Sequence, residues 1–159
     1  MENKQPVIDQ KWDYRFMDMA KTVASWSSCV RNGRHVGAVI VKNKRILTTG
    51  YNGAPIGVLN CRDKGYCMRD KLNIPSGTRA EMCYAIHAEQ NAIIQAARMG
   101  VSVEGATIYV THQPCSVCTR IIINAGIKRV VYEVPYPDDF SAKLWEESGL
   151  EVIKLPEKV

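Results

Sequence analysis

The chain has 159 residues, of which 46% are hydrophobic and 23% are charged, a composition typical of a globular protein with one core. No apolar run approaches the roughly 20 residues that a membrane span requires, and the first residues lack the apolar centre of a secretory signal, so we expect a cytoplasmic chain. The formal net charge of +5 favours an anionic ligand without distinguishing a small anion from a polyanion.

The sequence contains six cysteines, and their setting decides how they are interpreted. A chain of this length buries enough surface to fold without disulfides or an obligatory metal. In a reducing compartment, clustered cysteines are more often metal ligands or reactive thiols than cross-links. The six are therefore candidates for metal binding or for chemistry.

The first part of the chain predicts a helix followed by a β-hairpin. Apolar residues recur at helical spacing over 12–28, and the helix is expected to end before Asn32-Gly33. The β-rich runs 36–41 and 45–51, separated by Lys42-Asn43-Lys44, predict two antiparallel strands. The glycines and Pro55 of segment 50–57 exclude regular structure, so this loop is a candidate wall of a site.

Segment 61–82 is polar, charged and cysteine-bearing, with no clear periodicity. A loop this long in a small protein is usually functional or held by a bound group, and a metal would hold this one. We therefore treat residues from about 58 to 85 as a cysteine-bearing insert.

The second half predicts helices that alternate with strands. Helices are expected at 87–99, 116–125 and 140–147, and strands at 106–111, 128–134 and 150–155. This alternation implies parallel pairing, so we expect an α/β fold with one mixed sheet covered by helices on both faces. No linker or repeat interrupts the chain, and we expect residues 1–159 to form a single domain with its core at about 10–135.

Two short motifs indicate chemistry: His87-Ala88-Glu89 and Pro114-Cys115-Ser116-Val117-Cys118, each at the expected start of a helix. One imidazole and two thiolates make the three protein ligands of a catalytic zinc site, which leaves a fourth position open for water. The positive end of a helix favours the thiolate form of nearby cysteines. A Cys-x-x-Cys pair alone would equally fit a redox pair or half of a structural zinc site, but the upstream His-x-Glu favours catalytic zinc.

Glu89 need not bind the metal. From the first turn of its helix, the carboxylate can take a proton from a water at the open position and deliver it to a substrate, which contributes about 10²- to 10⁴-fold in rate. His-x-Glu followed by Pro-Cys-x-x-Cys is the known signature of zinc-dependent nucleobase deaminases.

The chain resembles the cytidine and deoxycytidylate deaminase superfamily, most closely its deoxycytidylate (dCMP) branch. The resemblance runs from about the first helix to Val130, and the zinc motifs identify the superfamily. The loop Gly50-Tyr51-Asn52-Gly53-Ala54-Pro55, followed by a cysteine-bearing insert, points to the dCMP branch. The resemblance implies a three-layer α/β/α fold with a mostly five-stranded mixed sheet. It also implies zinc-dependent hydrolysis of dCMP to dUMP and ammonia, in the supply of precursors for thymidine nucleotides.

By position, the resemblance implies zinc ligation by His87, Cys115 and Cys118 and proton transfer by Glu89. It also suggests nucleotide contacts from Asn52, Arg98 and Tyr136. The alternative for Arg98 is a favourable charge at a helix C-terminus, and the alternative for Tyr136 is a half-buried loop aromatic. His35 and His112 have no such support and are interpreted as ordinary polar residues.

Four cysteines are left over: Cys29, Cys61, Cys67 and Cys83. Four thiolates are the number that closes a structural zinc site, and some phage-type relatives carry a second zinc in this region, so we predict a second, structural Zn²⁺ here. The alternative is that Cys29 and Cys83 are small buried apolar residues on helix faces.

The resemblance further implies a homo-oligomer, with a hexamer favoured, activated by dCTP and inhibited by dTTP, with Mg²⁺ accompanying the triphosphate. Two rival functions stay open: a deaminase acting on cytosine or adenine in a polynucleotide, and a zinc-stabilised binding module without catalysis. A polynucleotide enzyme needs a charged track and stacking aromatics, whereas this chain has two Phe, three Trp and seven Tyr and no dense basic run. A binding module would not need Glu89. We expect a small nucleotide substrate, with no membrane and no nucleic acid polymer as partner.

Overall fold

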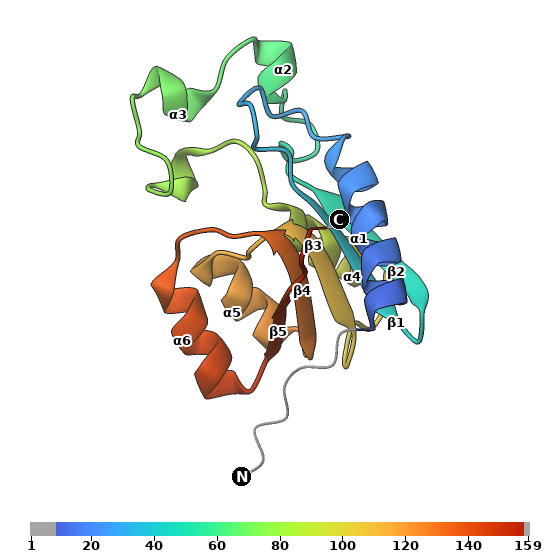
Figure 1. Ribbon diagram of the computed structural model, residues 1–159. Coiled ribbons are helices and arrows are strands. Elements are labelled where there is room, and N and C mark those ends of the chain that lie inside the picture. The colour runs from blue at the N-terminus through green and yellow to red at the C-terminus, as the bar shows by residue number, and fades with distance from the viewer. Residues whose placement is uncertain (1–8, 158–159) are drawn as a thin grey trace.

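The computed structural model describes residues 9–157, and its centre is a five-stranded sheet with the strand order β2-β1-β3-β4-β5 (Figure 1). The strands are β1 (Gly37–Lys42), β2 (Arg45–Tyr51), β3 (Thr107–His112), β4 (Arg129–Val134) and β5 (Glu151–Lys154). β1 pairs antiparallel with β2 and β3, whereas β3, β4 and β5 run parallel. The predicted mixed sheet is confirmed.

Helices cover both faces of this sheet, which makes three layers. On one face, α1 (Gln10–Ala24) packs over strand residues such as Val39 and Val131. The other face packs against α4 (Ala88–Met99), α5 (Ser116–Asn124) and α6 (Asp139–Ser148) through residues such as Ile40 and Val130. Successive strand side chains point to opposite faces, so strands buried on both sides appear in the sequence as nearly continuous apolar runs. No helix within residues 9–157 is long and apolar enough to cross a membrane.

The insert between β2 and α4 is not wholly irregular. It contains two short helices, α2 (Cys61–Lys64) and α3 (Met68–Lys71), and the 3₁₀ helix η1 (Ala80–Met82). In Figure 1 these green segments stand away from the sheet, beyond the loop that follows β2. The Asn60 side chain caps α2 by accepting a hydrogen bond from the Asp63 backbone N–H at 2.9 Å. Asparagine is a preferred N-cap residue, so the sequence does contain a signal for this short helix.

The first helix ends at Ala24, before the predicted position 28. The Ser27 hydroxyl is buried and donates to the Asn52 carbonyl at 2.9 Å, and the Trp26 ring packs edge-on against Tyr51. These contacts with β2 and its following loop draw the chain out of the helix, and sequence periodicity cannot show them. Cys29 consequently lies beyond the helix rather than on its face.

Gly50 sets how closely α4 approaches the sheet. A Cβ atom at Gly50 would lie 2.3 Å from the Ala88 carbonyl oxygen, so only glycine permits this distance. Beside it, the Thr48 hydroxyl donates to the Ala92 carbonyl at 2.9 Å. The close contact places the N-terminus of α4, with His87 immediately before it, at the end of β2.

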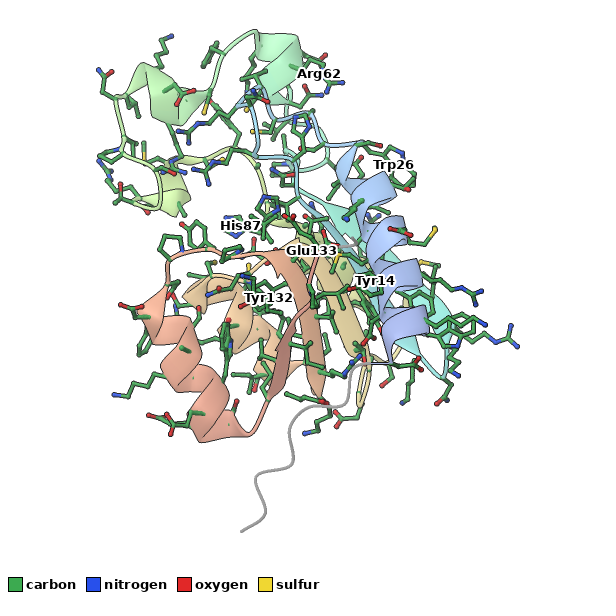
Figure 2. All side chains as sticks on the ribbon, viewed as in Figure 1. Tyr14, Trp26, Arg62, His87, Tyr132 and Glu133 are labelled. Carbon is green, nitrogen blue, oxygen red and sulfur yellow. The ribbon has the colours of Figure 1, made fainter. Side chains whose placement is uncertain are left out.

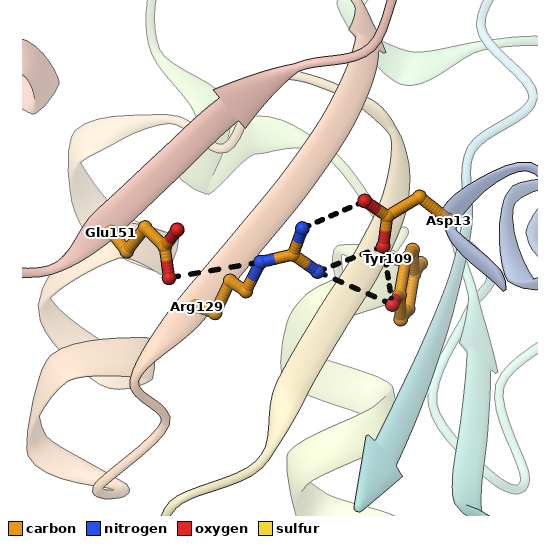
Figure 3. Close-up of polar contacts among 4 residues, drawn as sticks. All are labelled: Asp13, Tyr109, Arg129 and Glu151. Atoms are coloured by element: carbon orange, nitrogen blue, oxygen red, sulfur yellow. Dashed lines mark hydrogen bonds and ion pairs between the residues drawn. The ribbon is translucent and has the colours of Figure 1, made fainter. Parts of the chain in front are cut away.

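A buried polar cluster joins α1 to the face of the sheet that it covers (Figure 3). Arg129 Nη1 and Nη2 donate to the two carboxylate oxygens of Asp13 at 2.8 and 2.7 Å, and the Tyr109 hydroxyl donates to Asp13 Oδ1 at 2.8 Å. Glu151 Oε2 lies 3.7 Å from Arg129 Nε at the edge of the cluster. Asp13 is fully buried, and the two-pronged arginine contact satisfies its charge.

Candidate active site

Three metal-ligating side chains from two helix N-termini meet at one end of the sheet. His87 is the N-cap residue of α4, Cys115 is the N-cap residue of α5, and Cys118 lies in the first turn of α5. His87 Nδ1 lies 3.2 Å from Cys118 Sγ and 3.6 Å from Cys115 Sγ. All three ligand atoms lie within 4.8 Å of one another. Figure 2 shows His87 between the sheet and the insert.

Hydrogen bonds to the backbone hold both helix starts in place. The His87 N–H donates to the Gln90 side chain at 3.0 Å, and the Ser116 and Ser141 N–H groups donate to the Asp138 carboxylate at 2.7 and 3.0 Å. Asp138 therefore links the start of α5 to the start of α6. Burial alone would raise the pKa of Asp138, but these hydrogen bonds outweigh burial and lower it.

The donor set fits Zn²⁺. Tetrahedral coordination with Zn–S near 2.3 Å and Zn–N near 2.1 Å places ligand atoms about 3.5–3.8 Å apart, and the sulfur–nitrogen distances here are 3.2 and 3.6 Å. Hydrogen bonding to Cys118 lowers the pKa of Cys115 to about 4, whereas the same contact raises the pKa of Cys118. One thiol is thus ionised at neutral pH without any metal, and thiolate is the form that binds zinc.

Glu89 lies beside these ligands and is only 5% exposed. Its carboxyl interacts with the Cys118 side chain, and burial raises the pKa of Glu89. A buried carboxyl whose pKa is raised binds a proton more readily than a solvent-exposed one, which favours a role as a general acid and base. The position and environment of Glu89 therefore suit proton transfer.

A cavity of about 160 Å³ opens above this group. His87, Glu89 and Cys115 line one part of it, while the insert, the segment before β1 and the end of β3 line the rest. Two predicted nucleotide contacts, Asn52 and Tyr136, also line it. The Asn52 amide, however, is engaged with the backbone: Oδ1 accepts from the Val36 N–H at 2.8 Å and Nδ2 donates to the Arg34 carbonyl at 2.7 Å.

Arg98 is not brought to the cavity. It is exposed near the C-terminus of α4 and is absent from the residues that line the cavity. Eleven residues of helical rise separate it from His87, which is about 16 Å at 1.5 Å per residue. Arg98 is therefore not a contact within this cavity, and its nucleotide contact stays a prediction.

The four remaining cysteines, Cys29, Cys61, Cys67 and Cys83, all border this same cavity. Within residues 9–157, however, His87, Cys115 and Cys118 are the only group of three or more potential ligands whose atoms lie mutually within 4.8 Å. Burial raises the pKa of Cys29 and of Cys61, and neighbouring cysteines of the four raise them further. The alternative of small apolar residues on helix faces is wrong for Cys29 and Cys83, because neither lies in a helix.

Four residues that line the cavity were not predicted to lie at the site: Arg31, Arg34, Arg69 and His112. His112 was interpreted as an ordinary polar residue, yet it ends β3 immediately before the Cys115 motif, and ligands of α/β proteins bind beyond the carboxyl ends of strands. That position could have identified His112. The three arginines come from segments whose approach to the site only the tertiary structure determines.

Most of the chain matches a known protein family. The family description "Cytidine and deoxycytidylate deaminase zinc-binding region" matches residues 10–134. The "ComE operon protein 2" of Bacillus subtilis (strain 168) is 40% identical over 142 residues, covering 89% of this chain and 69% of that protein. The "Deoxycytidylate deaminase" of Schizosaccharomyces pombe is 38% identical over 142 residues, covering 89% of this chain and 43% of that protein. This chain therefore spans less than half of the yeast relative.

A solved structure is similar over its whole length. The dCMP deaminase of the cyanophage S-TIM5, in complex with dCMP and dUMP, aligns with a TM-score of 0.75 at 31% sequence identity. The alignment covers 94% of this chain and 100% of the cyanophage chain.

Proposed function

This chain belongs to the cytidine and deoxycytidylate deaminase family, and we propose that it hydrolyses dCMP to dUMP and ammonia. The observation that carries the proposal is the meeting of His87, Cys115 and Cys118 next to buried Glu89, at the wall of a cavity. The cyanophage relative, whose structure contains dCMP and dUMP, supports the choice of substrate.

The chain's own groups define the metal's place. His87 Nδ1 and the thiolates of Cys115 and Cys118 would hold one zinc ion, with Glu89 beside them as a non-ligand. When bound, zinc supplies a Lewis acid that lowers the pKa of a water ligand to about 7.

Glu89 performs the proton transfers. Its carboxylate takes a proton from the attacking water and delivers it to N3 of the cytosine ring, while the water oxygen forms the new bond to C4. The carboxylate then carries the second proton of that water to the 4-amino nitrogen. The C4–N bond breaks, ammonia leaves and C4 retains the oxygen as a carbonyl. One water supplies every added atom, and the buried position of Glu89 suits both transfers.

The four cysteines around the insert support a second proposal, a structural zinc ion. Their common position at one cavity favours a bound ion. Within residues 9–157, however, these four cysteines are not among the groups whose ligand atoms lie close enough together to hold one. Elemental analysis of purified protein is expected to give two zinc ions per chain. One zinc ion per chain together with four freely titratable thiols would contradict this proposal.

Several further features stay predictions. A single domain over residues 1–159 and a cytoplasmic location are expected from the sequence pattern, whereas a homo-oligomer, activation by dCTP with Mg²⁺ and inhibition by dTTP are expected from the family resemblance. Sigmoidal dCMP kinetics that become hyperbolic with dCTP would support the regulation, and no response to either triphosphate would count against it.

Ammonia release from a panel of cytosine compounds tests the proposed function. Zinc-loaded protein should show its highest kcat/KM on dCMP, compared with deoxycytidine, CMP, dCTP and a cytosine-containing oligonucleotide. Ammonia release from the oligonucleotide alone would replace the proposal with polynucleotide deamination. Absence of ammonia from every compound would favour a non-catalytic zinc module.

A further inference from the structure

The cavity wall carries more positive than negative charge. Three arginines, Arg31, Arg34 and Arg69, line it, whereas Glu89 is the only carboxylate among the lining residues. Arg31 is already paired, since its Nε lies 3.1 Å from Asp70 Oδ1. In the part of the chain that the structure describes, no carboxylate lies within 4.0 Å of the guanidinium of Arg34 or Arg69. Two cations therefore face the cavity without an ionic partner.

Arg34 is held by its backbone, which leaves its guanidinium available. The Asn52 side chain bridges the Arg34 carbonyl and the Val36 N–H at 2.7 and 2.8 Å, so Asn52 positions the segment before β1. The Arg34 guanidinium itself donates to the Ser76 hydroxyl of the insert. A neutral hydroxyl does not compensate the arginine charge, which leaves that charge free to bind an anion.

Arg69 carries an unsatisfied buried donor. Its Nη2 donates to the carbonyls of Pro75 and Thr78 at 2.8 and 2.7 Å, which fixes the side chain within the insert. Its Nε is buried and has no hydrogen-bond partner, the single such side-chain atom within residues 9–157. A buried charged donor without an acceptor costs free energy, so an acceptor supplied from the cavity would stabilise this arrangement.

We propose that Arg34 and Arg69 bind the phosphate group of the substrate. This inference rests on the proposed function and names the residues that select a nucleotide over a nucleoside. Arginine matches phosphate oxygens with two parallel N–H donors, and a nucleoside has no group that could use them. Arg98 does not line the cavity and is not part of this phosphate site.

The test compares dCMP with deoxycytidine, which differs only in lacking the phosphate. In Arg34→Gln and in Arg69→Gln, kcat/KM for dCMP should fall about 10- to 100-fold, mainly through KM, because a hydrogen bond to a charged group is lost. The value for deoxycytidine should be unchanged. Arg79→Gln is the matched control: Arg79 is in the insert, pairs with Glu81 at 3.2 Å and does not line the cavity. It should alter neither substrate.

Binding of inorganic phosphate to zinc-loaded protein provides a readout that does not depend on turnover. Calorimetry should detect binding to the wild type that Arg34→Gln weakens and Arg79→Gln does not. Equal losses on dCMP and deoxycytidine, or a selective loss in Arg98→Gln instead, would overturn the inference. The wild type could bind phosphate but deaminate none of the compounds. If Arg34→Gln then weakens the phosphate binding, the proposed function fails and the phosphate site stands.

Discussion

The molecule contains two buried polar clusters that differ in whether their charges and hydrogen-bonding groups find partners within the chain. In the cluster around Asp13, the carboxylate receives two hydrogen bonds from Arg129 and one from Tyr109, so charge and donors are matched within the chain. In the cluster around His87, two sulfurs and an imidazole nitrogen converge beside buried Glu89 and face a cavity. The groups of the first cluster are paired within the chain, whereas those of the second are available to bind a metal and a substrate. Pairing within the chain is typical of a cluster that stabilises the fold, and unpaired ligating groups at a cavity are typical of a functional site.

Removing the metal should have the largest effect, and this effect should be confined to the cluster around His87. Dialysis against a strong zinc chelator is expected to abolish ammonia release from dCMP, because His87, Cys115 and Cys118 then hold no Lewis acid. Far-UV circular dichroism should keep the signal of the sheet, since its two apolar cores do not involve these ligands. Added Zn²⁺ should restore activity. Full activity in zinc-free protein would contradict the assignment.

Glu89→Gln should separate chemistry from folding. The amide keeps the shape of the side chain but cannot carry a proton, so kcat should fall about 10²- to 10⁴-fold while zinc content is unchanged. Stability to urea should be equal or greater, because a carboxyl whose pKa is raised by burial is replaced by a neutral group. Glu81→Gln, at an exposed position of the insert, is the matched control. A wild-type rate at full zinc occupancy would exclude Glu89 as the proton carrier.

Asp13→Asn should show the opposite pattern. Loss of the charge leaves Arg129, whose side chain is only 15% exposed, without its buried carboxylate, and breaking such a pair costs about 3–5 kcal/mol in the free energy of unfolding. Urea denaturation measures this loss, and kcat per folded molecule should be unchanged.

Glu151→Gln is the control within the same cluster. Its side chain is 40% exposed and 3.7 Å from Arg129 Nε, so about 1 kcal/mol or less is expected. Equal losses in the free energy of unfolding for the two variants would show that the buried Asp13–Arg129 pair stabilises the fold no more than the exposed Glu151 contact does.

Asp138→Asn should give the smallest effect and depends on pH. Asparagine can still cap α6, so only the charge at the helix N-terminus is lost, which should cost about 0.3–1 kcal/mol at pH 6. The pKa of Asp138 is lowered in the folded chain. Its stabilisation is therefore present above the unfolded pKa of about 3.9 and is lost as the pH falls through the folded value. The difference in unfolding free energy between wild type and variant should shrink below about pH 4. A difference independent of pH would assign the effect to packing instead.

Local sequence pattern was sufficient to predict the His-Cys-Cys group and most of the fold. The motifs at His87 and Cys115 place each ligand at the start of a helix, and apolar periodicity with strand alternation predicted the mixed sheet, which the structure confirms. The end of the first helix was wrong because Ser27 and Trp26 contact the distant Asn52 and Tyr51. Periodicity reports only which face of a helix is apolar, not where a distant segment competes for its last turn.

The sequence by itself determined the family and identified the His-Cys-Cys group and Glu89 beside it, because each depends on residue type at short spacing. Only the tertiary structure decided which cations face the cavity. It places Arg98 at the far end of α4 and brings Arg34 and Arg69 from two separate segments to the same cavity. The physical reason is distance: a helix carries a residue away at a fixed rise, whereas chain reversal around a sheet joins positions that no local pattern connects.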